Sequence, residues 1–340
     1  MKLGIIGLPS SGKTTVFETL TKNISEVSNK SEKRIGTVKV PDQRIDILTD
    51  MYKPKKTIFA QVEYFLPGKT SSKKDQNIWT QIRDCDAIIH VVRNFLGNSF
   101  EDKSPYQDFL KLDQELIFSD LVVVEKRLEY LKTEQKRGRK IDLEEFQLLE
   151  KCNEKLENEI PLRKAPELTA EPVLKGFTFL SAKPTLILLN NDDEDDSMPD
   201  LKELAQSEDH MMMRGRLEHE LAQMPEDDAK DFLEEYNIQT PAMDRVIQKS
   251  YDLLGLISFF TVGEDEVRAW TIRKDTIAVD AADAIHSDIK KGFIRAETLF
   301  YGDLMEAETY QNARKKGIVR LEGKTYIVKD GDIINFRFNV

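Results

Sequence analysis

The stretch GIIGLPSSGKTT, residues 4–15, decides the fold predicted for this chain. It fits the spacing G-x-x-x-x-G-K-[ST] through Gly7, Gly12, Lys13 and Thr14. The apolar run before it favours a β-strand, and the segment VFETLTK after it favours a helix. A strand, a glycine turn and a helix are the context that this phosphate-binding motif requires.

The residue types of this motif explain how it would hold a nucleotide. Glycines let successive backbone N–H groups point at a phosphate, and the following helix adds its positive N-terminal end. Lys13 would reach the β- and γ-phosphates, and the Thr14 hydroxyl would ligate Mg²⁺. A chance glycine turn between a strand and a helix is the alternative, and we prefer the phosphate loop because both flanks are correct. The expected ligands of this loop are therefore Mg²⁺ and a nucleoside triphosphate.

Composition limits the other possibilities. The 340 residues are 40% hydrophobic and 33% charged, which is typical of a soluble globular protein with two or three domains. No apolar run is long enough to cross a bilayer. The apolar stretch within the first residues, MKLGIIG, is too short for the core of a signal peptide. Cys85 and Cys152 lack metal-ligand spacing and favour a reduced compartment, so we expect a location in the cytoplasm. We also expect a monomer without membrane contact. The net charge of −11 argues against nonspecific coating of nucleic acid, although local basic patches remain possible.

Three short runs rich in β-formers indicate an α/β core. They are Thr57 to Leu66, Ala87 to Val92 and Thr185 to Leu189, and helical patterns lie between them. This order predicts a doubly wound parallel sheet whose ligand site lies at the carboxyl ends of the strands.

A helical insertion is expected between the second and third runs. Residues 113–159 contain no proline and one glycine, and their apolar residues recur at helical spacing. The basic turn KRGRK, residues 136–140, divides this segment into two halves, which predicts an antiparallel helical hairpin. Two interpretations of the turn stay open: a solvated loop, or a contact with RNA or phosphate.

The third run ends in NNDDEDD, which places an N-x-x-D pattern at a strand end. The amide of Asn190 can bridge a purine base and the phosphate loop, and the Asp193 carboxylate can accept the N1 and N2 hydrogens of guanine. From about Thr261 onward, strand signals and the turns Glu322-Gly323 and Asp330-Gly331 predict a small α+β module.

The chain resembles the YchF or Obg-like ATPase family of the P-loop GTPase class. The residues that carry the resemblance are GLPSSGKTT (7–15), VPDQRID (40–46), RDCDAIIHVVRNF (83–95), KPTLILLN (183–190), LISFFTVGEDEVRAWT (256–271), KKGFIRAET (290–298) and LEGKTYIVKDGDIINFRFNV (321–340). The resemblance covers nearly the whole chain. It implies a P-loop G domain at residues 1–112 and 178–260, an inserted helical coiled-coil hairpin at 113–177, and a C-terminal TGS domain of β-grasp shape at 261–340.

The resemblance also implies a set of site residues. The phosphate-loop roles fall on Gly12, Lys13 and Thr14, with Thr14 as the metal ligand, and base reading falls on Asn190 and Asp193. The full set of expected nucleotide-binding residues is Pro9, Ser10, Ser11, Gly12, Lys13, Thr14, Thr15, Asn190 and Asp193. In the family the last motif position is commonly glutamate and accompanies a preference for ATP. Aspartate at 193 leaves both GTP and ATP open.

Several departures from the family pattern concern hydrolysis. Where the family has D-I-A-G, whose aspartate holds the Mg²⁺ shell through water, this chain has YFLPGK with Phe65 or Leu66 at that position. Glu63 is displaced along the strand. The switch threonine falls at or near Lys30, the following glycine-rich switch shortens to GKTSSKKDQN, and MRGR at 213–216 matches the fifth motif poorly. We therefore expect a nucleotide binder with weak or absent hydrolysis and assign no catalytic residue.

A second hypothesis treats the chain as a ribosome- or RNA-associated interaction protein in which the nucleotide is structural or regulatory. Related TGS modules often contact RNA or ribosomal partners, and this one offers Arg268, Arg273, Lys274, Lys290, Lys291 and Arg295. Ordinary surface charge is the alternative. His90 and MMM (211–213) are expected in the core, and His286 has no visible nucleophilic partner.

Overall fold

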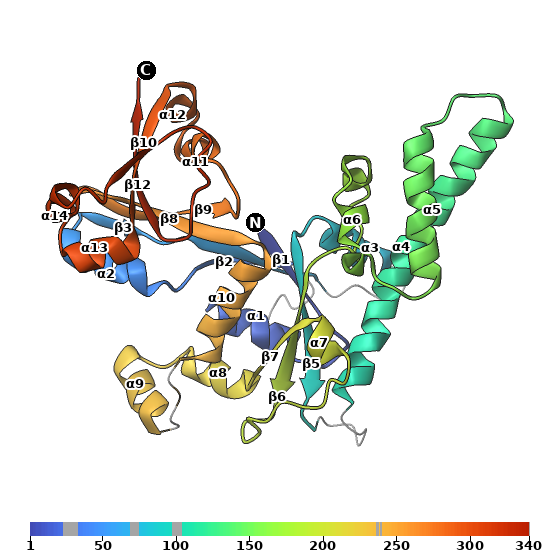
Figure 1. Ribbon diagram of the computed structural model, residues 1–340. Coiled ribbons are helices and arrows are strands. Elements are labelled where there is room, and N and C mark those ends of the chain that lie inside the picture. Colours follow the sequence, from blue (N-terminus) through green and yellow to red (C-terminus); the bar gives the residue numbers. More distant parts are fainter. Residues whose placement is uncertain (23–32, 69–74, 97–103, 236–237, 239, 340) are drawn as a thin grey trace. The chain divides into compact units, whose positions relative to one another are not determined.

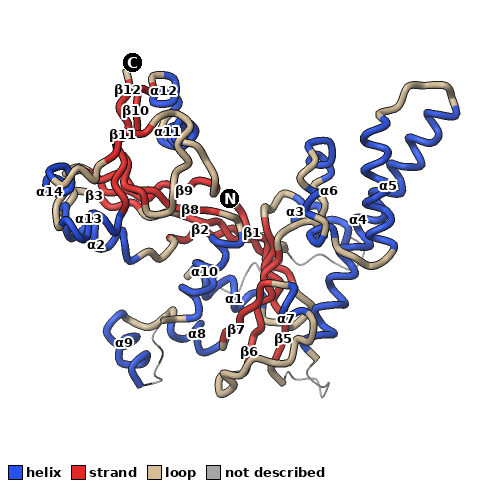
Figure 2. The backbone as a smooth tube through the Cα atoms, in the orientation of Figure 1, coloured by secondary structure: helices blue, strands red, loops and turns tan. Residues whose placement is uncertain are grey.

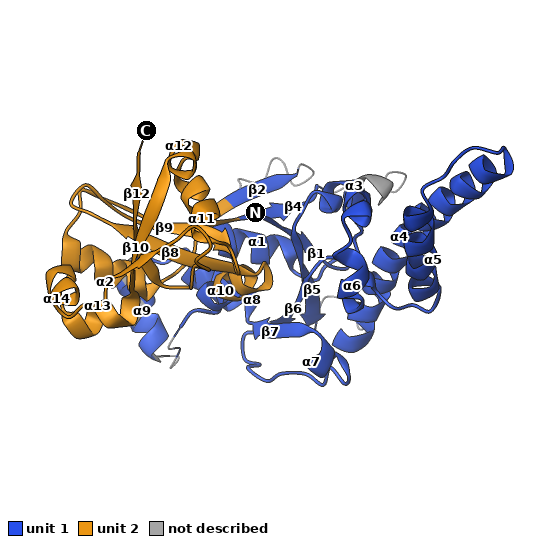
Figure 3. Ribbon diagram, turned by 45° about the horizontal axis from the view of Figure 1, so that its top comes forward, with its two compact units in different colours: residues 1–36, 63–246 blue, residues 37–62, 247–340 orange. Residues whose placement is uncertain are grey.

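The computed structural model describes residues 1–22, 33–68, 75–96, 104–235, 238 and 240–339. The chain forms two compact units, shown in Figure 3. The N-terminal unit comprises residues 1–36 and 63–246, and the C-terminal unit comprises residues 37–62 and 247–340. Within the described ranges, no helix combines the length and the apolar composition that crossing a membrane requires.

The N-terminal unit is built on a six-stranded sheet. Its strands, in spatial order, are β2 (Arg34–Lys39), β4 (Gln61–Leu66), β1 (Lys2–Ile6), β5 (Ala87–Asn94), β6 (Thr185–Asn191) and β7 (Asp209–Met213). The pairs β4–β1, β1–β5, β5–β6 and β6–β7 are parallel. All seven residues of β6 are buried, as expected for a central strand that has both faces covered.

Helices alternate with these strands along the chain, as the blue and red segments of Figure 2 show. They are α1 (Lys13–Thr21), α3 (Asp75–Arg83), α4 (Pro105–Lys136), α5 (Leu143–Glu157), α6 (Pro166–Thr169), α7 (Leu204–Ser207), α8 (Gly215–Leu221), α9 (Glu226–Glu235) and α10 (Ala242–Leu253), which continues into the C-terminal unit. Two short 3-10 turns, Leu162–Lys164 and Pro172–Phe177, follow α5. The unit is therefore mixed α/β, and the strands β4, β1, β5, β6 and β7 of its sheet run parallel.

Helices α4 and α5 lie side by side and extend away from the sheet (Figure 1). They share an apolar core in which Val124, Leu128, Leu149 and Cys152 are buried. The buried Asp120 of α4 fixes the base of this pair, because its carboxylate accepts hydrogen bonds from the backbone N–H groups of Leu180 and Ser181 and from Arg83. The helix pair therefore has its own core and is attached to α3 and to the segment that precedes β6.

The C-terminal unit contains a second six-stranded sheet. Its order is β11 (Arg320–Glu322), β10 (Phe293–Phe300), β12 (Asp332–Phe338), β8 (Leu256–Val262), β9 (Glu266–Arg273) and β3 (Lys56–Ile58). Its helices are α2 (Gln43–Tyr52), α11 (Ala278–Ile285), α12 (Ser287–Lys291), α13 (Tyr301–Ala307) and α14 (Tyr310–Lys315). Phe259, Ala281, Phe293 and Phe336 form the centre of the apolar core on one face of this sheet.

The structure corrects the prediction of one strand over Thr57 to Leu66. The segment forms two strands in different sheets: β3 pairs with β9, and β4 pairs with β1. The chain leaves strand conformation at Phe59 and Ala60, where the Ala60 carbonyl accepts from the backbone N–H of Val40. Residues 37–62, which the sequence-based division assigned to the G domain, group with the C-terminal unit.

Candidate nucleotide-binding site

The predicted phosphate loop connects β1 to α1. The buried strand ends at Ile6, and α1 begins at Lys13 with Gly12 as its N-cap. Gly12 has a left-handed backbone with φ 92°, and a Cβ atom there would lie 2.1 Å from Nδ2 of Asn190. Glycine is therefore required at position 12 both by the backbone conformation and by the neighbouring asparagine.

Lys13 turns its side chain back over the loop. Its ammonium donates to the carbonyl oxygens of Gly7 at 2.7 Å and Leu8 at 2.6 Å. These bonds hold the ammonium beside the N-terminal end of α1. A phosphate there would be attracted by the ammonium and by the positive end of the helix dipole.

One buried polar atom of the loop has no protein partner. The Ser11 side chain is 1% exposed, and its Oγ makes no hydrogen bond with any residue that the structure describes. A buried hydroxyl without a partner costs free energy unless a ligand or water satisfies it. Together with the Gly12 backbone and Lys13, this hydroxyl fits a loop shaped for a polyanion.

The other predicted loop residues take positions consistent with the motif. Pro9 and Ser10 are exposed at the tip, and Ser10 has φ 62°. Thr14 and Thr15 lie half-buried in the first turn of α1. The residues described contain no cluster of three or more His, Cys, Asp or Glu side chains that would hold a metal ion without further ligands.

Asn190 joins three segments at the carboxyl end of β6. Its Nδ2 donates to the carbonyl of Ser11 at 3.1 Å, and its Oδ1 accepts from the backbone N–H of Gly215 at 3.0 Å. A Cβ at position 215 would lie 2.4 Å from this Oδ1, so glycine is required there too. The sequence interpretation missed Gly215, which belongs to the MRGR segment that matched the fifth motif poorly. The glycine two residues after the MMM run was the available signal.

Asp193 lies beside the first turn of α8. Its Oδ1 accepts from the backbone N–H of Leu217 at 3.1 Å, and Oδ2 is 3.7 Å from Nε of Arg216. The structure thus brings Asn190 to the phosphate loop, while Asp193 contacts the start of the neighbouring helix. The role of Asp193 in reading a base stays a prediction.

The third-motif position carries no acidic group. Phe65 is 4% exposed and packs with Ile6, Ile82 and Leu112 in an apolar cluster, and Leu66 is also buried. Glu63 pairs in register with Lys2, and their side chains form an ion pair at 3.5 Å. Because β1 and β4 are parallel, Glu63 lies near the amino end of β1 and the phosphate loop follows its carboxyl end. Position 30 and most of GKTSSKKDQN lie outside the described residues.

Packing explains the position of His90, whereas His286 is exposed; of the methionine run, Met213 is buried and Met211 and Met212 are half-buried. His90 is buried in β5 and stacks on Phe109 with ring centroids 4.9 Å apart. Burial, together with the positive charges of Arg163 and Lys13, lowers the pKa of His90 to about 3. His286 caps α12 by accepting from the backbone N–H of Asp288, and the methionine run forms most of β7.

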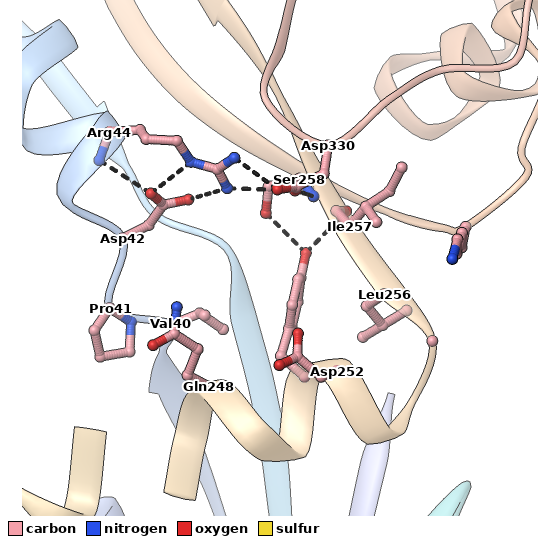
Figure 4. Close-up of a pocket in the computed structure, with 13 residues that line it drawn as sticks. Val40, Pro41, Asp42, Arg44, Gln248, Asp252, Leu256, Ile257, Ser258 and Asp330 are labelled. Atoms are coloured by element: carbon pink, nitrogen blue, oxygen red, sulfur yellow. Dashed lines mark hydrogen bonds and ion pairs between the residues drawn. The ribbon is translucent and has the colours of Figure 1, made fainter. Parts of the chain in front are cut away.

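The C-terminal unit contains a cavity of about 440 Å³, shown in Figure 4. Arg44 bridges Asp42 and Asp330 across it, with distances of 2.8 Å and 2.6 Å. Its lining contains three carboxylates, with Asp252 as the third, and two cations, with Lys274 as the second. The excess of negative charge makes this cavity unsuitable for a triphosphate.

Most of the predicted basic contacts are paired within the protein. Arg268 lies over the Trp270 ring at 3.7 Å from its centroid, Lys290 bonds to Asp280 and Asp283, and Lys291 bonds to Asp288. In the turn between α4 and α5, Arg137 and Arg139 both bond to Glu134. The side chains of Lys274 and Arg295 have no ion pair or hydrogen bond among the described residues, and Arg295 is in register with Arg337.

The phosphate loop connects strand β1 to helix α1 at the carboxyl end of the strand, and Asn190 from β6 is bonded to this loop. This arrangement defines a P-loop nucleotide-binding domain of the GTPase class. A family model described as 50S ribosome-binding GTPase matches residues 2–127. A second model, YchF-GTPase_C, described as a protein of unknown function (DUF933), matches residues 256–339.

Full-length relatives extend this class to a particular family. The "Ribosome-binding ATPase YchF" of Bacillus subtilis is 38% identical, with 99% of each chain covered. The protein of the same name from Escherichia coli O157:H7 is 37% identical over 100% of this chain and 99% of its own length. The solved YchF GTPase of Schizosaccharomyces pombe superposes with a TM-score of 0.84 at 29% identity, covering 99% of this chain and 97% of its own. The chain belongs to the YchF family.

Proposed function

We propose that this chain binds GTP or ATP with Mg²⁺ at its phosphate loop and acts as a nucleotide-dependent regulator of a translation-related partner. The observation that carries the proposal is the phosphate loop, where the Lys13 ammonium, the unpartnered Ser11 hydroxyl and the N-terminal end of α1 meet. The Thr14 hydroxyl would hold Mg²⁺, which neutralises phosphate charge when bound.

Base recognition is proposed for Asn190 and Asp193. The hydrogen bonds of Asn190 to Ser11 and Gly215 support this proposal, because they connect the phosphate loop with the loop after β7. Asp193 offers carboxylate oxygens that suit guanine N1 and N2 hydrogens, whereas the family resemblance implies a preference for ATP. Both purines therefore belong in the test.

Titration with fluorescent GTP and ATP analogues, with and without Mg²⁺, tests binding directly. Lys13→Ala is expected to abolish binding of both nucleotides because the phosphates lose their ammonium contact. Lys22→Ala, at the other end of α1, is the matched control and is expected to bind normally. Retained affinity in Lys13→Ala would refute the phosphate-loop assignment.

We further propose that hydrolysis is slow. Fast hydrolysis of a bound triphosphate depends on groups that hold the metal shell and position a water. The apolar packing of Phe65 and the ion pair of Glu63 with Lys2 support the absence of a third-motif carboxylate. Single-turnover phosphate release with Mg²⁺, measured beside the Bacillus subtilis relative, is the test. A rate equal to that of the relative would overturn this part of the proposal.

The proposed partner is the ribosome. The curated relatives are named ribosome-binding, and the turn between α4 and α5 places Lys136 and Lys140 beside the paired Arg137 and Arg139. We propose that the helix pair is the family's coiled-coil hairpin and that residues 261–340 form its TGS domain. These two parts would supply the ribosome contacts.

An alternative function is favoured by the same missing carboxylate: a ribosome-associated interaction protein in which the bound nucleotide is structural. Co-sedimentation with large ribosomal subunits, with GTP, ATP or no nucleotide, separates the two proposals. If the nucleotide is regulatory, adding it should change the fraction of the protein that sediments with the subunits. If the nucleotide is structural, this fraction should be the same for all folded samples.

A further inference from the structure

The strand β7 lies at one edge of the sheet in the N-terminal unit. It pairs with β6 through five consecutive residue pairs, from Asp209 to Met213, without a register shift. An edge strand presents one row of backbone N–H and C=O groups away from its neighbour. Among the described residues, no segment other than β6 forms a backbone hydrogen bond with Met211, Met212 or Met213. The outer row of β7 therefore has hydrogen-bonding capacity that the described part of the chain does not use.

The side chains of β7 do not protect this edge in the usual way. Natural edge strands often carry lysine, proline or a bulge that prevents pairing with another chain. Apart from Asp209 at its start, β7 has no residue with a permanent charge and no proline. Its carboxyl half is a run of three methionines, and methionine is a flexible residue that is frequent on surfaces that bind several partners. The composition of β7 therefore favours pairing with an additional strand.

A cavity of about 330 Å³ lies at the carboxyl end of β7. Its charged lining residues are Arg214, Arg245 and Glu218, and its apolar walls come from Met212, Met213, Ile238 and Ala242. Glu218 is 4% exposed, and its two oxygens accept from the backbone N–H groups of Ala242 at 2.8 Å and Met243 at 3.2 Å. This carboxylate thus caps the first turn of α10. Two guanidinium groups against one carboxylate leave the cavity with one net positive charge.

The two guanidinium groups have unused hydrogen-bond donors. Each guanidinium carries five N–H donors. Nη1 of Arg214 donates to the backbone carbonyl of Asp193 at 3.5 Å, which is a long bond. Arg245 is exposed, and its guanidinium has no hydrogen bond or ion pair with any residue of the described ranges. A carboxylate that enters the cavity would accept from these donors and neutralise the net charge.

We propose that the outer edge of β7 and this cavity together bind an extended, acidic peptide segment of a partner protein. The peptide adds a strand beside β7, and one of its carboxylates lies in the cavity at Arg214 and Arg245. Backbone bonds along the added strand supply affinity, and the cavity supplies the selection for an acid. The charge complementarity of the cavity argues for this occupant. The inference goes beyond the proposed nucleotide binding and does not depend on it.

Peptide selection followed by titration tests the site on the full chain. A phage library of random heptapeptides with free carboxyl ends is selected on the protein, and the enriched peptides should carry Asp, Glu or the terminal carboxylate at one constant position. The enriched peptide is then labelled with fluorescein and titrated by fluorescence anisotropy. Arg214→Gln and Arg245→Gln should each weaken its binding about tenfold or more, because hydrogen bonds between charged groups are the strong ones. Lys175→Gln removes an exposed cation of the same unit that does not line the cavity, and this matched control should bind like the wild type.

N-methylation of the same peptide tests strand pairing. Successive N–H groups of a strand point to opposite sides, so only every second one bonds to β7. Methyl groups on these alternate nitrogens should weaken binding about tenfold or more, and methyl groups on the nitrogens between them should have little effect. Amidation of the peptide's carboxyl end shows whether the bound carboxylate is the terminus or a side chain.

Three outcomes overturn the inference. The first is a selection that enriches no peptide, or only peptides without a carboxylate at a constant position. The second is wild-type affinity of the enriched peptide for Arg245→Gln, or an effect of N-methylation that does not alternate along the peptide. The third is a wild-type dimer in sedimentation equilibrium that dissociates in Arg245→Gln, because this result would assign the edge of β7 to a second copy of the chain.

Discussion

Replacing Asn190 by alanine should damage both the stability of the N-terminal unit and its affinity for nucleotide. The side chain is 5% exposed and makes two hydrogen bonds, to the Ser11 carbonyl and from the Gly215 N–H. Each buried backbone group left without a partner costs about 1–3 kcal/mol. The two groups together give an expected loss of about 2–6 kcal/mol in the free energy of unfolding.

The two tryptophans make this loss measurable. Trp79 lies in the N-terminal unit and Trp270 in the C-terminal unit, so Trp270→Phe leaves Trp79 as the fluorescent reporter of the N-terminal unit. With an m-value of about 2 kcal/mol/M, the urea midpoint of Asn190→Ala should fall by about 1–3 M.

A matched variant separates stability from binding. Asn94 is buried in β5 and donates to Asn191 at 3.0 Å, and among the described residues neither of these two side chains hydrogen-bonds to the phosphate loop. Asn94→Ala should lower the urea midpoint and retain nucleotide affinity, whereas Asn190→Ala should lose both. An unchanged midpoint in Asn190→Ala, or equal nucleotide affinity in the two variants, would show that Asn190 does not organise the loop.

Two further predictions use the same Trp79 reporter. Because the pKa of His90 falls from the ordinary 6.5 to about 3, the unfolded chain binds a proton that the folded chain does not. Stability should thus fall as the pH falls below 6.5, by up to about 1.4 kcal/mol per pH unit, and urea midpoints of His90→Phe should lack this contribution. Arg163→Met should cost about 3–5 kcal/mol because it leaves Asp113 and Glu208 buried without their guanidinium partner. A triple variant that also carries Asp113→Asn and Glu208→Gln should recover part of the lost midpoint, and no recovery would contradict the charge argument.

The spacing of apolar residues along the sequence correctly predicted individual strands. The strands at Ala87 to Val92 and Thr185 to Leu189 are confirmed as β5 and β6, and Asn190 lies at the strand end where its pattern placed it. The break near Ala60 was not predicted, because alternating apolar residues indicate a strand but not the sheet to which it belongs.

The contact of Gly215 was missed for a different reason. A backbone N–H supplies the bond to Asn190, and every residue except proline carries one. Glycine is needed at position 215 because a Cβ atom there would collide with Asn190. This requirement follows from the three-dimensional structure and cannot be inferred from the sequence alone. The pairing of Lys290 and Lys291 with nearby carboxylates likewise depends on side-chain positions that composition does not determine.

The strand β3 has a consequence for how the protein is made. It pairs with β9, and the neighbouring residues Lys55 and Asp265, which also form an ion pair, are 210 positions apart in the chain. At roughly 5–20 residues per second, a ribosome needs about 10–40 s to synthesise the partner strand after β3 emerges. During that interval β3 has no partner strand with which to pair. A fragment of the protein that starts after β3 would leave the edge of β9 exposed to other chains.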